Sequence, residues 1–343
     1  MTKNRIRIIS KERIMAVVRN KEFWLVLAVL LFWFCSYKLD ESVMPILLDD
    51  EYGYWANSSY FMGLDWSSIT GNIAYYSYGY SLILLALRMI APWLNVGGWD
   101  SMYQLATTFN LLMLVASFLI AVRLCRRYMK NMNWIVRCVA CFVVMLYPAY
   151  KIYSHITLSE CALTFFFWIF LYTMHRVTDK PSILNHAAFA LVSVYMYTIH
   201  QRTLAQFITA IIIVLLVRLR RISRLRDTAV FGAAMCGGLM LHSVIKQNLQ
   251  NTLYMGKPPV GAAGLLSYAL TKKTALMIVL FLIAMLLLYL IEHGKSRLVF
   301  VMVLAGAVTA GVYVAGRAGA GNAAADALPD RLAMNDFAGQ WEK

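Results

Sequence analysis

Long apolar stretches separated by short polar segments run through most of this chain. The first stretch, Phe23 to Tyr37, follows a basic tail and has no small-residue cleavage site behind it, which predicts a retained membrane anchor. A membrane-spanning helix needs about 20 mainly apolar residues. At that length the pattern predicts further spans near residues 103–124, 134–152, 158–175, 186–199, 204–217, 228–245, 274–291 and 298–315.

Composition supports this interpretation. Hydrophobic residues make up 61% of the 343 residues, and the mean hydropathy is +0.62, values that exclude a single soluble domain. Only helices or closed barrels satisfy the backbone in lipid, and these apolar runs do not alternate as barrel strands do. We therefore expect an all-α polytopic membrane protein with about nine transmembrane helices, and interfacial juxtamembrane helices in the first outer loop.

The basic residues indicate topology rather than nucleic-acid binding. The formal net charge is +15, but Lys and Arg lie in short runs between apolar segments and form no continuous patch. If the apolar segment 78–94 spanned the membrane, three later basic runs would lie outside, against the positive-inside bias. We therefore expect 78–94 to be an interfacial or re-entrant helix on the outer surface. The N-terminus then lies inside, in a cytoplasmic membrane of bacterial type.

This topology divides the chain into three parts. Residues 1–22 form a basic cytoplasmic tail, and residues 23–315 form the multi-span membrane domain. The first outer loop covers residues 40–102. Residues 316–343 form an outer C-terminal stretch that leads into no further span. The alternative that the chain is truncated at this point stays open.

The first outer loop carries the first group of candidate functional residues. No Lys or Arg occurs between Lys38 and Arg88, and the loop includes Asp49, Asp50 and Glu51. Such a cluster at a membrane surface is costly unless something uses it. From Tyr54 onward, aromatic and small polar residues recur at helical spacing, which predicts a short helix along the bilayer surface. The alternative is that the acids only stabilise the N-terminus of this helix.

A second group lies at the tip of a later hairpin, where H-Q-R-T joins two short apolar segments. Arg202 and His200 are expected near headgroup depth, where a guanidinium can hold a phosphate bidentately. The alternative is an arginine that reaches to lipid headgroups. Lys246, at the start of a predicted outer loop 246–273, is a further candidate for binding the phosphate.

Two more candidates flank another outer helix end, in S-H-I-T-L-S-E. They are His155 and Glu160. Thr157 or Ser159 has a simpler interpretation as a helix cap. Glu160 is harder to explain structurally, because it begins an apolar run.

These segments together resemble the GT-C superfamily of membrane glycosyltransferases, in particular the branch with protein O-mannosyltransferases and lipid A aminoarabinose transferases. The resemblance rests on a basic tail, one span, an outer loop with D-E-x-x-Y, and then Y-S-Y-G-Y-S-L-I-L-L-A-L at Tyr76 to Leu87. The family pattern places an acidic pair in the first outer loop, here Asp50 and Glu51. It also places an arginine at the tip of a later hairpin, here Arg202. The proline usual before the juxtamembrane helix is replaced here by S-Y-G-Y-S.

The resemblance implies transfer of a sugar from a polyprenyl-phosphate-linked donor to a lipid, glycan or protein acceptor on the outer face of the membrane. Asp50 would act as the general base, with Glu51 helping to orient the acceptor, and the anomeric carbon would invert. Arg202, His200 and Lys246 would bind the donor phosphate, and Asp49, Tyr54, His155 and Glu160 would complete the outer-face site. No metal site or certain cofactor follows, although the loop acids are of the type that binds a hard cation. The alternative function is a transporter or flippase for an anionic lipid or solute.

Overall fold

The computed structural model describes residues 24, 26–28, 31, 49–70, 77–145, 148–258, 264, 269 and 272–292. Within these residues every regular element is a helix. Several helices are long and strongly apolar, which indicates a membrane protein. The predicted spans at 23–37 and 298–315 lie outside the described residues, apart from five positions in the first.

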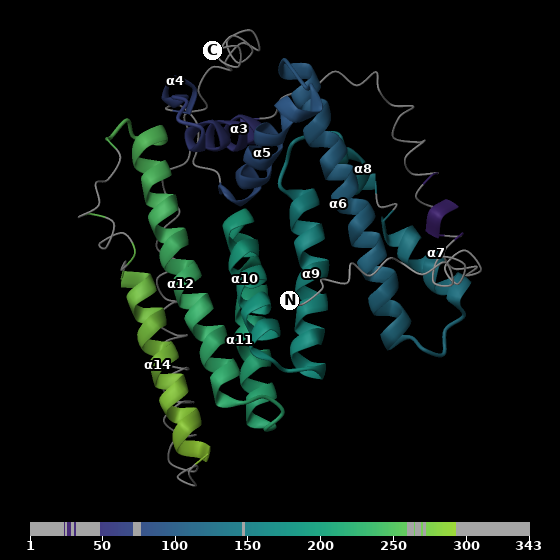
Figure 1. Ribbon diagram of the computed structural model, residues 1–343, viewed down its shortest axis with the longest axis vertical. Coiled ribbons are helices and arrows are strands. Elements are labelled where there is room, and N and C mark those ends of the chain that lie inside the picture. The colour runs from purple at the N-terminus through teal and green to yellow at the C-terminus, as the bar shows by residue number, and fades with distance from the viewer. Residues whose placement is uncertain are drawn as a thin grey trace, which may run out of the picture. The chain divides into compact units, whose positions relative to one another are not determined.

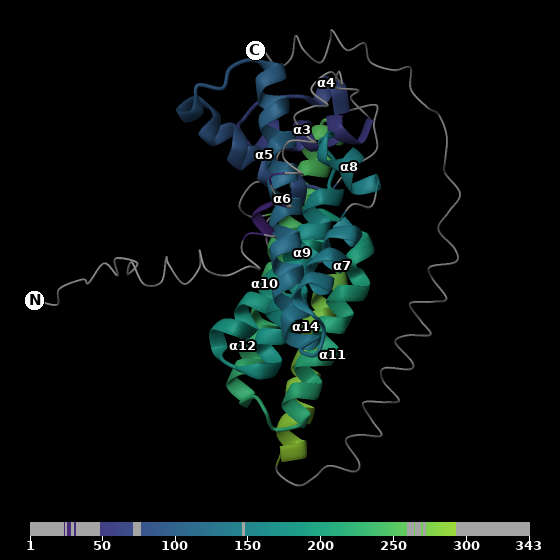
Figure 2. The same ribbon diagram turned by 90° about the vertical axis from the view of Figure 1, so that its right-hand side faces the viewer.

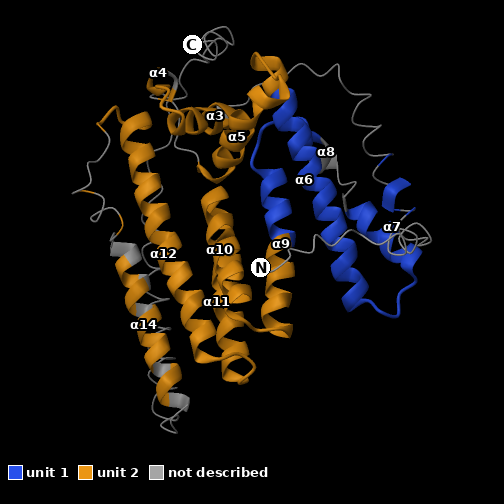
Figure 3. Cartoon of the chain, viewed as in Figure 1, with its two compact units in different colours: residues 1–46, 103–168 blue, residues 47–102, 169–343 orange. Residues whose placement is uncertain are grey.

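The chain forms two compact units, coloured separately in Figure 3. Unit 1 contains residues 1–46 and 103–168, and unit 2 contains residues 47–102 and 169–343. Unit 1 includes most of α6 (Trp99–Tyr128), α7 (Trp134–Met145), α8 (Pro148–Ser154) and the first half of α9 (Glu160–Asp179). The side-chain amide of Asn110 on α6 donates a hydrogen bond of 2.8 Å to the backbone oxygen of Ile156. This bond ties the segment before α9 to α6.

The single span predicted at 134–152 is wrong in detail. The structure has two shorter helices there, α7 and α8, and α8 begins at Pro148. Proline fits the first turn of a helix but not its interior, because it lacks the N–H that an interior position donates. Pro148 therefore marks a helix start inside what the hydropathy alone presents as one apolar run.

Unit 2 contains a helix bundle and a cap of short helices. The bundle consists of the second half of α9, α10 (Ile183–Ile199), α11 (Leu204–Leu219), α12 (Leu225–Leu249) and α14 (Lys272–Glu292). The cap consists of α3 (Asp49–Phe61), α4 (Ser67–Thr70), α5 (Gly79–Ile90) and the 3₁₀ helix η1 (Ala91–Leu94). In Figures 1 and 2 the cap helices lie at one end of α10 and α12, and α3 runs across that end.

The start of α5 is fixed against the end of α10 by a close approach that only glycine permits. A Cβ atom at Gly79 would lie 2.4 Å from the backbone nitrogen of Ile199 and 2.6 Å from Thr198. The Tyr195 hydroxyl on α10 also donates a hydrogen bond of 2.9 Å to the Gly79 carbonyl oxygen. The Y-G-Y sequence thus allows α5 to pack directly on α10 and positions the cap on the bundle.

Four helices among the described residues are long and apolar enough to cross a membrane: Trp99–Tyr128, Glu160–Asp179, Gln201–Leu219 and Leu225–Tyr254. They match the spans predicted at 103–124, 158–175, 204–217 and 228–245. Helices α10 and α14 cover the predicted spans 186–199 and 274–291. The loop predicted to begin at Lys246 begins later, because α12 continues to Leu249 and is followed by the π-helical segment η3 (Gln250–Tyr254).

Candidate active site

The acidic sequence of the first loop forms the first turn of α3. Acidic side chains at this position interact favourably with the positive end of the helix dipole, which accounts for a helix that begins at Asp49. Asp50 is exposed, whereas every residue from Glu51 to Ser59 is buried. The prediction of a helix lying along the bilayer surface does not fit this burial, because such a helix would present one face to lipid. The structure describes no side-chain position for Asp49.

One face of α3 packs on α5. The rings of Tyr54 and Tyr80 meet edge to face at 5.3 Å, and the Arg88 guanidinium donates a hydrogen bond of 2.7 Å to the Ser59 hydroxyl. Glu51 precedes Tyr54 by three residues, so helical spacing places it on the face that packs against α5. Its side chain is fully buried. The acidic pair is therefore divided between an exposed Asp50 and an interior Glu51.

Arg88 is a cation held inside this interface. Burial lowers its pKa to about 10, so the guanidinium remains protonated at neutral pH. Tyr54, predicted as an outer-face site residue, is 4% exposed and belongs to the same packed core. The interface thus serves to hold α3 in place.

The H-Q-R-T tip joins α10 to α11, as predicted from the hairpin, through a 3₁₀ turn at Gln201–Thr203. The Nδ1 atom of His200 accepts a hydrogen bond of 3.0 Å from the backbone N–H of Arg202. The His200 carbonyl accepts a second bond, of 2.8 Å, from the Thr203 hydroxyl. Because Nδ1 is an acceptor, His200 is neutral in this arrangement and carries its proton on Nε2. Arg202 is exposed beside it.

Asp50 and the tip form one electrostatic group. Burial, followed by the charge of Arg202, lowers the pKa of His200 below its ordinary value, while the charge of Asp50 acts in the opposite direction. Segments 150 residues apart in sequence thus place the charges of a carboxylate and a guanidinium close enough to His200 to act on it. His200 and Arg202 can donate hydrogen bonds to an anion, and Asp50 presents an exposed carboxylate.

Unit 2 also holds a buried cluster of aromatic rings that no local sequence pattern predicts. The Tyr78 hydroxyl lies 3.1 Å from Nδ1 of His242, and the two rings stack with centroids 5.5 Å apart. The Tyr197 ring meets the His242 ring edge to face, with centroids 5.2 Å apart. Burial raises the pKa of Tyr78 above its usual range, with Tyr195 as a smaller cause, so its hydroxyl remains a donor. The cluster links the cap to α10 and α12.

The remaining predicted site residues lie elsewhere. Lys246 is in the last turn of α12, one turn beyond His242, rather than in a loop. His155, with Nδ1 at 3.3 Å from the Ser154 hydroxyl, and Glu160, the first residue of α9, both belong to unit 1. A role for these three residues beside Asp50 stays a prediction.

Among the described residues, no three His, Cys, Asp or Glu side chains cluster in a way that would hold a metal ion. Comparisons with protein-family models, with curated proteins and with solved structures find no match to this chain.

Proposed function

We propose that this protein is a membrane glycosyltransferase that moves a sugar from a polyprenyl-phosphate-linked donor to a hydroxyl acceptor on the outer face of the membrane. The observation that carries the proposal is that Asp50 and Arg202 are both exposed and that both of their charges act on His200. An exposed base and an exposed guanidinium are the two groups that such a transfer requires. The proposal includes the predicted nine spans, with the N-terminus inside and the cap of unit 2 outside.

In the proposed reaction, Asp50 removes the proton from the acceptor hydroxyl as its oxygen attacks the anomeric carbon. The new glycosidic bond forms while the bond from the anomeric carbon to the phosphate oxygen breaks, and the configuration at that carbon inverts. The departing lipid phosphate gains negative charge. Arg202 and the Nε2–H of His200 stabilise that charge by hydrogen bonding.

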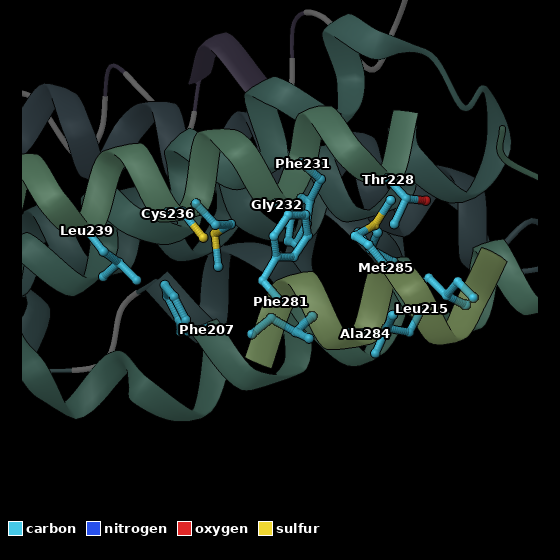
Figure 4. A pocket seen from close by; sticks show the side chains of 14 residues that line it. Phe207, Leu215, Thr228, Phe231, Gly232, Cys236, Leu239, Phe281, Ala284 and Met285 are labelled. Atoms are coloured by element: carbon cyan, nitrogen blue, oxygen red, sulfur yellow. The ribbon is translucent and has the colours of Figure 1, made fainter. Parts of the chain in front are cut away.

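An apolar groove in unit 2 supports a lipid-linked donor. It has a volume of about 260 Å³ and lies between α11, α12 and α14 (Figure 4). Phe207 and Leu239 line it. Phe207 is five residues beyond Arg202 on the adjoining helix, which corresponds to about 7.5 Å of rise. A donor with its phosphate at Arg202 can therefore place its hydrocarbon chain along this groove.

The experiment that tests the proposal is transfer of labelled sugar from polyprenyl-phosphate donors by the purified full chain in detergent. Asp50→Asn is expected to reduce turnover by about 10²- to 10⁴-fold, the usual contribution of a general base. Asp100→Asn, also an exposed acid of unit 2, serves as the control and should retain turnover. Wild-type turnover in Asp50→Asn would overturn the proposal. Donor that is redistributed across vesicles without being consumed would indicate a transporter instead.

A further inference from the structure

A second cavity lies in unit 2, beyond the C-terminal end of α3. Its volume is about 510 Å³, within the range of roughly 300–1,000 Å³ that is usual for small-molecule sites. One wall comes from the turn after α3 and the start of α4, and the other from η3 and the segment after it. The lining includes Tyr60, Asp65, Ser67, Thr252 and Lys257.

Hydrogen bonds hold the two walls together. The Thr70 hydroxyl on α4 donates a bond of 2.6 Å to the carbonyl oxygen of Leu253, and the Tyr254 hydroxyl donates one of 3.2 Å to the Asn57 side-chain oxygen. Leu253 and Asn57, which supply the two accepting oxygens, are both buried. Leu253 and Tyr254 belong to the π-helical segment, and π-helical turns occur frequently at functional sites. The cavity is therefore pre-formed by the fold.

The rim of the cavity depends on two turns with left-handed backbone conformations. Gly63 has a φ of 78° and Gly256 a φ of 60°, values that other residues adopt only with strain. Both glycines line the cavity. Glycine thus occupies the two positions at which the walls of the cavity turn.

The lining offers both hydrogen-bond acceptors and donors. Asp65 Oδ1 accepts a bond of 2.9 Å from the Ser67 backbone N–H, and this bond is the main reason that the pKa of Asp65 lies below its ordinary value. The Lys257 ammonium is exposed, and in the described part of the chain it forms no ion pair with Asp65. Thr252 has a buried hydroxyl without a hydrogen-bond partner among the described residues. The charges of the Asp65 carboxylate and the Lys257 ammonium cancel, so the lining carries no net charge.

This combination matches a neutral polyhydroxylated ligand. Sugar hydroxyls both donate and accept, so they can bind a carboxylate and an ammonium at the same time. The Tyr60 ring supplies an apolar surface for the C–H face of a sugar. An anionic or purely apolar ligand would leave Asp65 or Lys257 unmatched.

The position of the cavity separates it from the donor phosphate. Asp50 and Tyr60 lie ten residues apart on α3, or roughly 15 Å at 1.5 Å per residue. A donor sugar is bonded directly to its phosphate, so it cannot lie in this cavity while that phosphate lies beside Arg202. An acceptor of several sugar units can span the distance.

We infer that this cavity binds a sugar unit of an extended, neutral saccharide acceptor, with Asp65, Lys257 and Tyr60 as its specificity-determining contacts. The inference rests on the proposed transferase function, because it names the acceptor of that reaction. The acceptor hydroxyl that reacts would then lie at Asp50, several sugar units away from the unit bound in the cavity.

The test measures saccharide binding to the purified full chain in detergent by saturation-transfer NMR. The probes are mannotetraose, maltotetraose and tetra-N-acetylchitotetraose. At least one is expected to bind, and Asp65→Asn and Tyr60→Ala should each weaken that binding at least tenfold. Asn retains the oxygen that accepts the Ser67 N–H, so Asp65→Asn should fold normally. Asp100→Asn is the control that should bind as the wild type does, and Tyr60→Phe, which keeps the ring, should bind more tightly than Tyr60→Ala.

Absence of binding by all three probes, or equal binding by wild type, Asp65→Asn and Tyr60→Ala, would overturn the inference. Asp50→Asn separates this result from the proposed function. Asp50-dependent transfer by a protein that binds none of the three saccharides would contradict the acceptor cavity but not the transferase. Saccharide binding that depends on Asp65, in a protein that transfers no sugar, would support the cavity and contradict the transferase.

Discussion

At the scale of single residues, the acidic pair of the first loop separates into two different environments. Asp50 is exposed and its charge acts on His200, while Glu51 is fully buried. The sequence identifies both acids as unusual, because a charge cluster beside an apolar segment is costly. It cannot separate them, because the burial of Glu51 depends on contacts that form only in the folded chain.

His200 gives a pH dependence with a defined sign. Its pKa lies below the ordinary value of 6.5, chiefly because of burial, so the folded protein binds fewer protons there than the unfolded chain. The stabilisation is fully present above about pH 6.5 and is lost as the pH falls through the lowered pKa of the folded state. We expect the melting temperature of the wild type in detergent to fall more steeply from pH 7.5 to pH 5 than that of His200→Asn. Parallel curves would contradict this assignment.

The same position provides a matched pair of variants at neutral pH. Asn supplies an oxygen near the position of His200 Nδ1 and can still accept the Arg202 N–H, whereas Ala cannot. His200→Ala is therefore expected to lose about 1 kcal/mol of unfolding free energy, as for a lost helix cap, and His200→Asn much less. Chemical denaturation of the two variants in the same detergent measures the difference.

At the scale of elements, the contact between α5 and α10 depends on Gly79. A methyl group there would meet the backbone of Ile199 at 2.4 Å, and α5 would have to move. Gly79→Ala is expected to cost about 1–3 kcal/mol of unfolding free energy, the usual penalty of overpacking, and to reduce transfer because α5 supports α3. Gly97→Ala is the control, because a Cβ there meets no atom within 4 Å. Equal stability of the two variants would show that the two helices do not need this close contact.

A second element contact depends on Gly232 of α12 and Phe281 of α14. A Cβ at Gly232 would lie 1.6 Å from the Phe281 ring, which covers it in Figure 4. Gly232→Ala should therefore displace the ring and destabilise the protein, while the double variant with Phe281→Ala should recover part of that loss. Thermal unfolding of both single variants and the double variant measures this coupling. Additive effects would mean that the two residues do not meet.

Hydropathy predicted the positions of most helices but not their partners. Spans at 158–175 and 228–245 coincide with α9 and α12 because long apolar runs have few alternatives in lipid. The break at Pro148 and the continuation of α12 into η3 depend on local backbone chemistry that a span-length window averages out. The contact between Tyr78 and His242 joins residues 164 positions apart. No local pattern in the sequence connects them.

At the scale of the whole molecule, the proposed orientation places the cap of unit 2 outside. It places the basic segments 176–180 and 218–226 inside. In a variant without its six natural cysteines, Asp100→Cys should react with a membrane-impermeant maleimide in intact cells. Lys180→Cys should react only after the cells are permeabilised. Both positions are exposed, so access depends on the side of the membrane. The reverse pattern would invert the topology and remove the outer-face site.

Asp50 and Arg202 have different tasks in the proposed reaction, and a paired measurement of donor binding and sugar transfer separates them. Donor binding and sugar transfer are measured on the same preparations of wild type, Asp50→Asn, Arg202→Ala and Asp100→Asn. We expect Asp50→Asn to bind donor within about twofold of wild type while losing about 10²- to 10⁴-fold in turnover. Arg202→Ala should weaken donor binding about tenfold or more, because it removes a charge-assisted contact to phosphate. Transfer at the wild-type rate by Asp50→Asn, or unchanged donor affinity in Arg202→Ala, would contradict the account.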